Sequence, residues 1–276
     1  MKSKIAAGKS MLIFAICLIT TGVFAQNDKN TGYVPHVGQA GKDVIWVPTP
    51  DALVAKMLEI AKVTPNDYLI DLGSGDGRTV IAAAKLNAKA TGVEYNPDMV
   101  ELSKRRAAEA GVSDRANFVK ADLFEYDFSD ATVITMFLLP EINLRLRPKL
   151  LELKPGTRIV TNTFTMGEWK PDLEVTIDES SSWNTALLWI VPAKVEGTWK
   201  MGQGELTLNQ EFQKFYGTLK QDGKSSPVSE GNVNGNTITF KVGGSVYSGQ
   251  VNGNSITGTN GSGNASKADW TASKIK

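Results

Sequence analysis

The fold of the N-terminal half is decided by the stretch Tyr68-Leu69-Ile70-Asp71-Leu72-Gly73-Ser74-Gly75-Asp76-Gly77-Arg78. An apolar run ends in an acid, three glycines then alternate with polar residues, and a helical pattern begins at about Thr79. This order predicts a strand, a tight loop and the start of a helix. Because glycine has no Cβ, a ligand can lie against the loop backbone, where the first N–H groups of the helix face it. The stretch therefore predicts a nucleotide-like ligand.

Strands and helices alternate on both sides of this stretch. Upstream, Thr49-Pro50 predicts a hydroxyl cap and a proline at the first position of a helix with an apolar stripe. Downstream, Asn96 can cap a helix that has Pro97 in its first turn and ends at Gly111. The other predicted elements are a helix at 79–86, strands at 90–94, 116–120, 131–137 and 157–164, and a helical stretch at 148–153. The alternation predicts an α/β fold, a Rossmann-like, doubly wound, mostly parallel sheet with helices on both faces.

The composition changes near residue 195. After Gly197 the chain is rich in Gly, Asn, Ser and Thr and forms short alternating segments, separated at two places by Asn234-Gly235 and Asn252-Gly253. Asn-Gly pairs are strong signals of hairpin turns. About eight strands of this kind predict a small all-β domain, an antiparallel meander closed as a barrel or folded as a sandwich. Its role stays open among substrate docking, surface attachment and support of the first domain.

The N-terminus has the pattern of a secretory signal peptide. Lys2, Lys4 and Lys9 precede an apolar core at 11–23, and Val23-Phe24-Ala25 matches a cleavage site before Gln26. The core is about 13 residues long, short of the ~20 that span a membrane, so an uncleaved anchor is the second reading. The sequence predicts a signal peptide at 1–25, a linker at 26–42, the α/β domain at 43–194 and the β domain at 195–276. The protein is expected to be exported, to be periplasmic or associated with the cell envelope, and to lie near a membrane.

Charge and cysteine content narrow the function. Without the three leader lysines, 27 basic residues face 29 acidic ones, a net charge of −2. A nucleic-acid binder usually needs a surplus of basic residues, so no nucleic-acid partner is expected. Cys17 is the only cysteine and lies in the leader, so the mature chain has neither a disulfide nor thiol chemistry. No cluster of metal ligands is predicted.

Three acids fall at predicted strand ends: Asp71, Glu94 and Asp122. In a sheet of this kind the ligand lies at the carboxyl ends of the strands. Glu94 can accept hydrogen bonds from both hydroxyls of a ribose, and Asp122 can hold an exocyclic amine of a base. Each acid alone could be a solvated loop residue and the glycine loop alone a turn, but their joint order favours one site.

The loop also indicates which nucleotide-like ligand binds. A dinucleotide fingerprint is Gly-x-Gly-x-x-Gly, whereas here Gly77 comes one residue early and Arg78 follows. No Gly-Lys-Ser or Gly-Lys-Thr is present in the loop, so a phosphate-binding P-loop is absent as well. These differences leave an adenosine ligand without phosphates.

The motifs Asp71 to Arg78, Gly92-Val93-Glu94 and Ala121-Asp122-Leu123 resemble the successive motifs of class I S-adenosylmethionine-dependent methyltransferases, over about residues 43 to 170. The resemblance implies that the glycine loop passes the methionine part of the cofactor, that Glu94 binds ribose and that Asp122 binds adenine. The S-adenosyl-L-methionine site expected on this basis comprises Pro48, Thr49, Asp71, Gly73, Ser74, Gly75, Asp76, Gly77, Glu94, Tyr95, Asn96, Asp122 and Leu123.

A narrower resemblance concerns the segment before the first helix. Trp46-Val47-Pro48-Thr49-Pro50, joined to the Asp-Gly-Arg ending of the loop, is similar to the lysine N-methyltransferases that act on the adenine nucleotide translocase and the ATP synthase c-subunit. It implies a protein lysine as the methyl acceptor. Trp46 and Pro48 either pack the first helix or cover the cofactor, and the family likeness favours the cover.

Methyl transfer from a sulfonium is an in-line displacement, which holding two reactants aligned can accelerate strongly. Methylation at cytosine C5 needs a cysteine that the mature chain lacks, and the Asn/Asp-Pro-Pro-aromatic motif of adenine methylation is missing, since Met136-Phe137-Leu138-Leu139-Pro140-Glu141 stands there. The apolar residues of this run can instead receive the alkyl stem of lysine, or they simply continue into the core. Glu141 or Tyr95 can assist. The predicted catalytic residues are Phe137, Leu138, Pro140 and Glu141.

The sequence thus predicts an S-adenosylmethionine-dependent methyltransferase that N-methylates protein lysine. Two alternatives stay open, an exported non-catalytic protein that binds an adenosine ligand and a small-molecule methyltransferase. The cofactor is made in the cytosol, so an exported enzyme would have to receive it from there.

Overall fold

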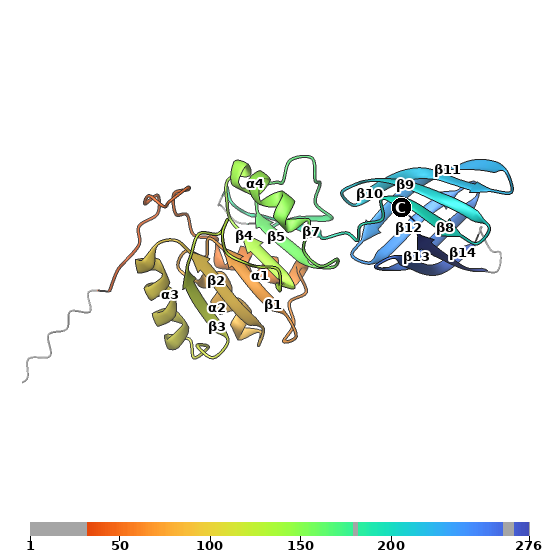
Figure 1. Cartoon of the computed structure of the whole chain (residues 1–276). Coiled ribbons are helices and arrows are strands. Elements are labelled where there is room, and N and C mark those ends of the chain that lie inside the picture. The colour runs from red at the N-terminus through yellow and green to blue at the C-terminus, as the bar shows by residue number, and fades with distance from the viewer. Residues whose placement is uncertain (1–31, 179–181, 262–267, 276) are drawn as a thin grey trace, which may run out of the picture. The chain divides into compact units, whose positions relative to one another are not determined.

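The computed structural model describes residues 32–178, 182–261 and 268–275. An α/β part comes first and a β-barrel part follows (Figure 1), and each is described by itself. The helices are α1 (Asp51–Ile60), α2 (Arg78–Lys85), α3 (Pro97–Glu109) and α4 (Pro140–Leu150). The strands of the α/β part are β1 (Tyr68–Leu72), β2 (Lys89–Glu94), β3 (Ala116–Lys120), β4 (Val133–Met136), β5 (Arg158–Asn162), β6 (Leu173–Thr176) and β7 (Thr185–Ile190).

The described strands of the α/β part form one seven-stranded sheet in the order β3-β2-β1-β4-β5-β7-β6. The first five strands in this order are parallel, and β1 lies in the middle with Asp71 opposite Gly92 of β2 and Thr135 of β4. The order reverses at β1, because the chain passes from β1 to β2 and β3 on one side and then crosses to β4 on the other side. Ligands bind at such a switch point, beyond the carboxyl ends of the strands.

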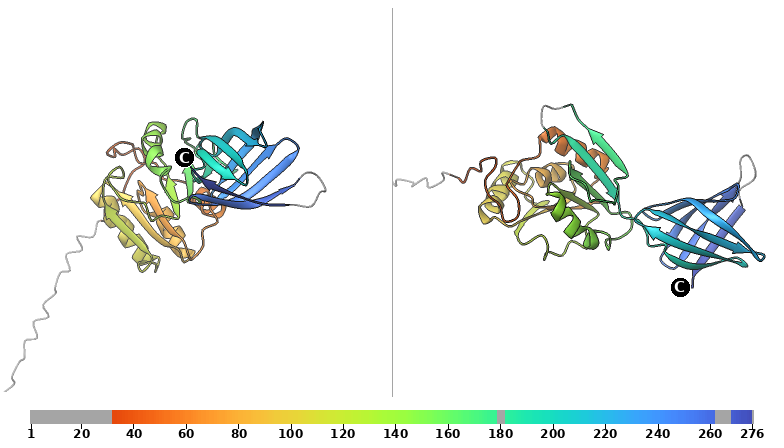
Figure 2. Two further views of the ribbon diagram at one scale, coloured as in Figure 1. Left: turned by 45° about the vertical axis from the view of Figure 1, so that its right-hand side comes forward. Right: turned by 90° about the horizontal axis from the view of Figure 1, so that it is seen from above.

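Helices cover both faces of the sheet (Figures 1 and 2). Successive residues of a strand point to opposite faces, and Leu69 and Ile70 of β1 accordingly belong to two different hydrophobic cores. One core contains the apolar sides of α1, α2 and α3, and the other contains α4 together with Trp169 and Trp189. The predicted α/β fold is confirmed.

The start of α1 corrects one sequence prediction. Pro50 is the N-cap residue and no side chain caps the helix, so the expected cap by Thr49 is wrong. The Thr49 hydroxyl instead accepts a hydrogen bond from Asn162 Nδ2 at 3.3 Å. Asn96, in contrast, caps α3 as predicted, with its Oδ1 accepting from Asp98 N–H at 2.9 Å.

The helix predicted at 148–153 begins earlier in the chain. It runs over Pro140–Leu150, with Pro140 in the first turn and Pro148 inside. Proline suits the first turn because the missing N–H would be unpaired there in any case. Pro148 has no N–H to donate to the Leu144 carbonyl four residues earlier.

The sheet also extends beyond the predicted strands. The antiparallel strands β7 and β6 continue it past β5. No element is predicted between residue 164 and residue 194, because the parallel alternation of strand and helix ends at β5.

The C-terminal part is a closed antiparallel barrel, which decides between the two predicted all-β forms. The turn glycines Gly235 and Gly253 have φ of 56° and 58°, as tight Asn-Gly hairpins require. Phe240 stacks on Tyr247 with ring centroids 4.9 Å apart, and Trp199 is fully buried, so side chains fill the interior. The strands are β8 (Gly197–Met201), β9 (Gly204–Glu211), β10 (Lys214–Gln221), β11 (Lys224–Asn234), β12 (Thr237–Val242), β13 (Ser245–Asn252), β14 (Ser255–Gly261) and β15 (Ala268–Lys274).

The predicted signal peptide lies outside the described residues. Within the residues that are described, no helix combines the length and the apolar character that crossing a bilayer requires.

Candidate active site

The glycine loop between β1 and α2 adopts a conformation that favours glycine. Gly73, Gly75 and Gly77 have φ of 77°, 53° and 79°, in the left-handed region. Gly73 N–H and Ser74 N–H both donate to the carbonyl of Val93, which ties the loop to β2. The loop also has a close neighbour, because a Cβ on Gly75 would lie 2.7 Å from Trp46 Nε1. Two parts of the chain far apart in sequence therefore meet at this glycine.

A cavity opens at the carboxyl ends of β1, β2 and β4, the place that the sheet order predicts. The three predicted acids, Asp71, Glu94 and Asp122, all line it. Gly77 is the one member of the predicted cofactor set that does not. The other lining members of that set are Pro48, Thr49, Gly73, Ser74, Gly75, Asp76, Tyr95, Asn96 and Leu123.

Glu94 is anchored to the loop that it faces. Its Oε2 accepts from Gly75 N–H at 2.9 Å and its Oε1 accepts from Asn96 N–H at 2.8 Å. Burial raises the pKa of the Glu94 carboxyl above its ordinary value, and these N–H bonds oppose that rise. The carboxylate keeps capacity to accept a hydrogen bond from a ligand hydroxyl.

Asp122 is engaged by a lysine from the segment before α1. Lys42 Nζ lies 2.7 Å from Asp122 Oδ2, and Phe124 N–H donates to Oδ1 at 2.9 Å. The Lys42 ammonium is the main reason that the pKa of the Asp122 carboxyl lies below its ordinary value. The Asp122 carboxylate is therefore negatively charged at neutral pH, and the Lys42 ammonium balances part of that charge.

Asp71 is the most perturbed acid of the cavity. It is 6% exposed, and the Thr135 hydroxyl donates to its Oδ1 at 2.6 Å. Burial raises the pKa of Asp71 to about 7, and the nearby carboxylates of Asp76 and Glu94 add to the rise. A positively charged ligand in the cavity would favour the ionised form.

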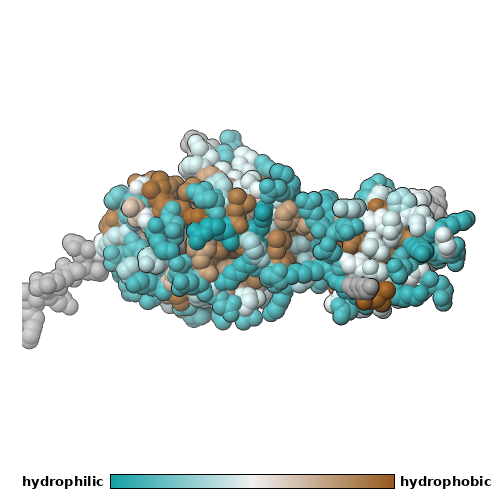
Figure 3. Space-filling model, turned by 45° about the horizontal axis from the view of Figure 1, so that its top comes forward, coloured by the Kyte–Doolittle hydropathy of each residue, from teal (hydrophilic) through white to brown (hydrophobic). Residues whose placement is uncertain are grey.

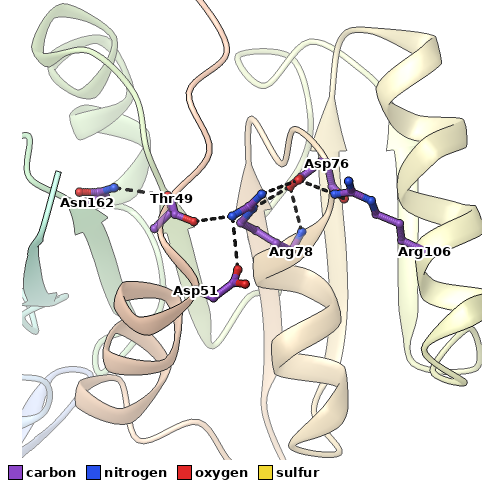
Figure 4. Close-up of polar contacts among 6 residues, drawn as sticks. All are labelled: Thr49, Asp51, Asp76, Arg78, Arg106 and Asn162. Atoms are coloured by element: carbon purple, nitrogen blue, oxygen red, sulfur yellow. Dashed lines mark hydrogen bonds and ion pairs between the residues drawn. The ribbon is translucent and has the colours of Figure 1, made fainter. Parts of the chain in front are cut away.

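Figure 4 shows a polar network beside the cavity that was not predicted from the sequence. Arg78 donates to Asp76 through Nε at 3.0 Å and Nη2 at 2.7 Å, and to the Thr49 carbonyl through Nη1 at 2.8 Å. Arg106 of α3 also contacts Asp76, whose side chain is 2% exposed. Burial alone would raise the pKa of Asp76, but the two guanidinium groups hold it below its ordinary value. The network holds the glycine loop against α3 and the start of α1.

The segment 33–49, named the strap here, covers the cavity. Trp46, Val47 and Pro48 line it, and the role of Trp46 and Pro48 in covering the cofactor stays a prediction. Residues 39–42, which were assigned to a linker, line it as well. Val34 and Val37 of the strap are 82% and 67% exposed. Figure 3 shows one face of the molecule, with hydrophobic residues gathered at several places on its α/β part.

The predicted catalytic residues divide into two groups. Phe137 and Leu138 line the cavity, together with Met136 and Ile142, and form an apolar wall. Pro140 and Glu141 are the first two residues of α4 and are not among the lining residues; Glu141 is exposed. The described residues contain no group of three or more His, Cys, Asp or Glu side chains placed to hold a metal ion.

The cavity fits S-adenosylmethionine on one further observation. Ser74 is among the residues that line the cavity, and its buried Oγ has no hydrogen-bond partner within the described chain. A buried hydroxyl without a partner is costly, and a polar ligand would satisfy it.

Comparison with known proteins agrees with this site. Residues 71–173 match the ANTKMT methyltransferase domain family. A protein-lysine N-methyltransferase of Saccharolobus islandicus (strain REY15A) is 44% identical over 162 residues, which cover 58% of this chain and 96% of the relative. The human lysine N-methyltransferase of the ATP synthase c-subunit is 40% identical over 120 residues, 43% of this chain and 50% of that protein, so the chain spans about half of its length.

A solved structure is similar over much the same fraction of the chain. It is an RNA methyltransferase from Salinibacter ruber in complex with S-adenosyl-L-homocysteine, 47% identical, with a TM-score of 0.52. The match covers 54% of this chain and 96% of that one.

Proposed function

The chain belongs to the S-adenosylmethionine-dependent lysine N-methyltransferases of this family, and from this premise we propose that it methylates the ε-amine of lysine side chains in proteins. The observation that carries the proposal is the match to nearly the whole length of the Saccharolobus protein. The carboxylates of Asp71, Glu94 and Asp122 line one cavity and supply hydrogen-bond acceptors for the cofactor.

The bound cofactor supplies an electrophilic methyl group, and the residues of this chain supply alignment and a dry environment. We assign Asp71, Glu94 and Ser74, which line the cavity, to binding and orienting the cofactor. We assign the apolar wall formed by Phe137, Leu138 and Ile142 to the acceptor lysine. Burial against such a wall lowers the pKa of a lysine ammonium, which gives the neutral amine that the displacement needs. Orientation of the reactants provides the remaining acceleration.

Methyl-labelled S-adenosylmethionine tests the acceptor class. The protein is incubated with soluble, membrane and RNA fractions of the cells that make it, and each product is treated separately with protease or ribonuclease. We expect label that protease releases. Label that only ribonuclease releases would instead support an RNA acceptor. RNA is the second candidate because the similar Salinibacter protein is named an RNA methyltransferase. Label in small molecules alone would support the small-molecule methyltransferase.

We propose further that the protein acts outside the cytosol. The support is the basic, apolar and small-residue pattern of residues 1–25. Cell fractionation followed by N-terminal sequencing tests it, with Gln26 expected as the first residue of the exported protein. A cytosolic protein that starts at Met1 would contradict it, and a membrane-bound protein that starts at Met1 would support the uncleaved anchor.

A further inference from the structure

Three aromatic side chains gather at the edge of the sheet beside the cavity. Phe137 follows β4, Phe164 follows β5 and Trp183 precedes β7. Their ring centroids lie 6.0 Å apart for Phe137 and Phe164, 5.7 Å for Phe137 and Trp183, and 5.3 Å for Phe164 and Trp183. The three residues are partly exposed, and none belongs to either hydrophobic core of the α/β part. We name this cluster the aromatic shelf.

The shelf continues the wall of the cavity. Phe137 belongs to both, because it lines the cavity with Leu138 and also contacts the other two rings. A ligand on the shelf would therefore reach the cavity along one apolar surface. Phe164 and Trp183 themselves lie outside the lining residues, so the site described above does not include them.

Buried polar groups hold the middle of the shelf in place. Thr163 has φ of 60°, a strained conformation for a β-branched residue, and it turns the chain directly after β5. The Thr161 hydroxyl donates to the Phe164 carbonyl at 2.7 Å, and Asn143 Nδ2 donates to the same carbonyl at 3.3 Å. Thr161 and Asn143 are both fully buried. Strain kept in place by buried hydrogen bonds is typical of functional positions.

We propose that the aromatic shelf binds the side chain of the acceptor lysine, an inference that rests on the proposed function. The alkyl stem lies against the rings, and the ammonium gains cation–π attraction from their faces before it enters the cavity. Lysine that is already methylated keeps its positive charge, so the shelf binds it too.

Binding of a minimal acceptor tests the shelf without turnover. The full-length protein is saturated with S-adenosylhomocysteine and titrated with Nα-acetyl-lysine amide, whose ε-amine is free. Binding is followed by nuclear magnetic resonance. Phe164→Leu and Trp183→Leu keep apolar bulk but remove the ring. We expect each to raise the Kd for the amide about two- to thirtyfold, the range that a cation–π contact provides. Trp183→Phe should retain most of the affinity.

Matched controls separate this effect from misfolding. Tyr216→Leu removes an aromatic ring that is 64% exposed on the barrel strand β10 and should leave the Kd unchanged. The Kd for S-adenosylhomocysteine should be the same in all variants, since neither Phe164 nor Trp183 lines the cavity. The norleucine analogue of the amide carries no charge. Its Kd should therefore be similar for the wild type and for the two leucine variants.

The shelf proposal and the proposed function fail in different ways. Protein-lysine methylation by the wild type together with an unchanged Kd for the amide in both leucine variants would overturn the shelf alone. Tighter ring-dependent binding of adenosine monophosphate than of the amide would overturn it in favour of base stacking. A wild type that methylates no protein would overturn the proposed function first.

Thr161 is a positioning residue in this account. Thr161→Val removes the donor to the Phe164 carbonyl and should raise the Kd for the amide without changing that for S-adenosylhomocysteine. Thr161→Ser restores the hydroxyl and should restore the affinity. Equal losses of both affinities in Thr161→Val would show that Thr161 supports the whole domain instead.

Discussion

At the scale of single residues, Asp71 couples the cavity to pH. Its pKa is raised to about 7, chiefly by burial, whereas an unfolded aspartate titrates near 3.8. The folded state therefore holds a proton over that interval that the unfolded state has released. The free energy of unfolding should fall as pH rises from 4 to 7, and this contribution should stay constant above 7.

Asp71→Asn should remove this dependence, because asparagine fills the same volume without titrating. Between pH 5 and pH 8 the group alone accounts for a change on the order of 3 kcal/mol. Urea unfolding of wild type and variant at pH 5 and pH 8 measures the difference, and parallel profiles for the two proteins would refute it.

The same acid should make cofactor affinity pH-dependent. The amino group of S-adenosylhomocysteine is positively charged and favours ionised Asp71, which lines the cavity. The Kd should fall by up to about tenfold between pH 6 and pH 8 in calorimetry. Asp71→Asn should bind more weakly with little pH dependence; a wild-type Kd equal at both values would contradict the assignment.

The two ion pairs that Asp76 forms with Arg78 and Arg106 should contribute to the free energy of unfolding. Arg78→Ala leaves a buried carboxylate with Arg106 alone and should lower the free energy of unfolding by about 2 to 4 kcal/mol. Lys104→Ala, on the exposed side of α3, removes one exposed ion pair and should change it by less than about 0.5 kcal/mol. Because the pKa of Asp76 is lowered, its contribution is complete above about pH 4 and is lost below. Equal effects of the two substitutions in urea unfolding would contradict this role.

At the scale of elements, the strap and the glycine loop should depend on each other. Gly75→Ala places a methyl group against the Trp46 indole and should weaken S-adenosylhomocysteine binding. Trp46→Ala in the same chain removes that collision and should recover part of the affinity, leaving the cost of the left-handed backbone. Calorimetry of the two single variants and the double variant measures the coupling, and purely additive losses would contradict the contact.

Elements governed by local rules were predictable from the sequence. The change from strand to helix across Asp71 to Arg78 is a local pattern, and Asn96 caps α3 by a contact with a residue two positions away. The start of α4 was not predictable, because Leu138 and Leu139 read as a continuing strand and Pro148 as a helix start. Asn162 meets Thr49 across 113 positions, and no sequence pattern encodes such a contact.

At the scale of the whole molecule, the β-barrel takes no part in lining the cofactor cavity. No residue of β8 to β15 lines the described cavity, and the Saccharolobus relative matches only 58% of this chain. A chain that ends at Ala193 should therefore bind S-adenosylhomocysteine with the affinity of the full protein. Lost methylation of protein acceptors with retained cofactor binding would assign acceptor docking to the barrel. Loss of cofactor affinity in a folded truncated chain would contradict the separation.

The central claim is that one cavity edged by carboxylates transfers methyl groups to lysine. The most direct measurement is tandem mass spectrometry of acceptor protein after incubation with labelled S-adenosylmethionine, for wild type and for Glu94→Gln. We expect label on the ε-nitrogen of lysine with the wild type and strongly reduced label with Glu94→Gln. Label on any other atom, or equal label with both proteins, would contradict it.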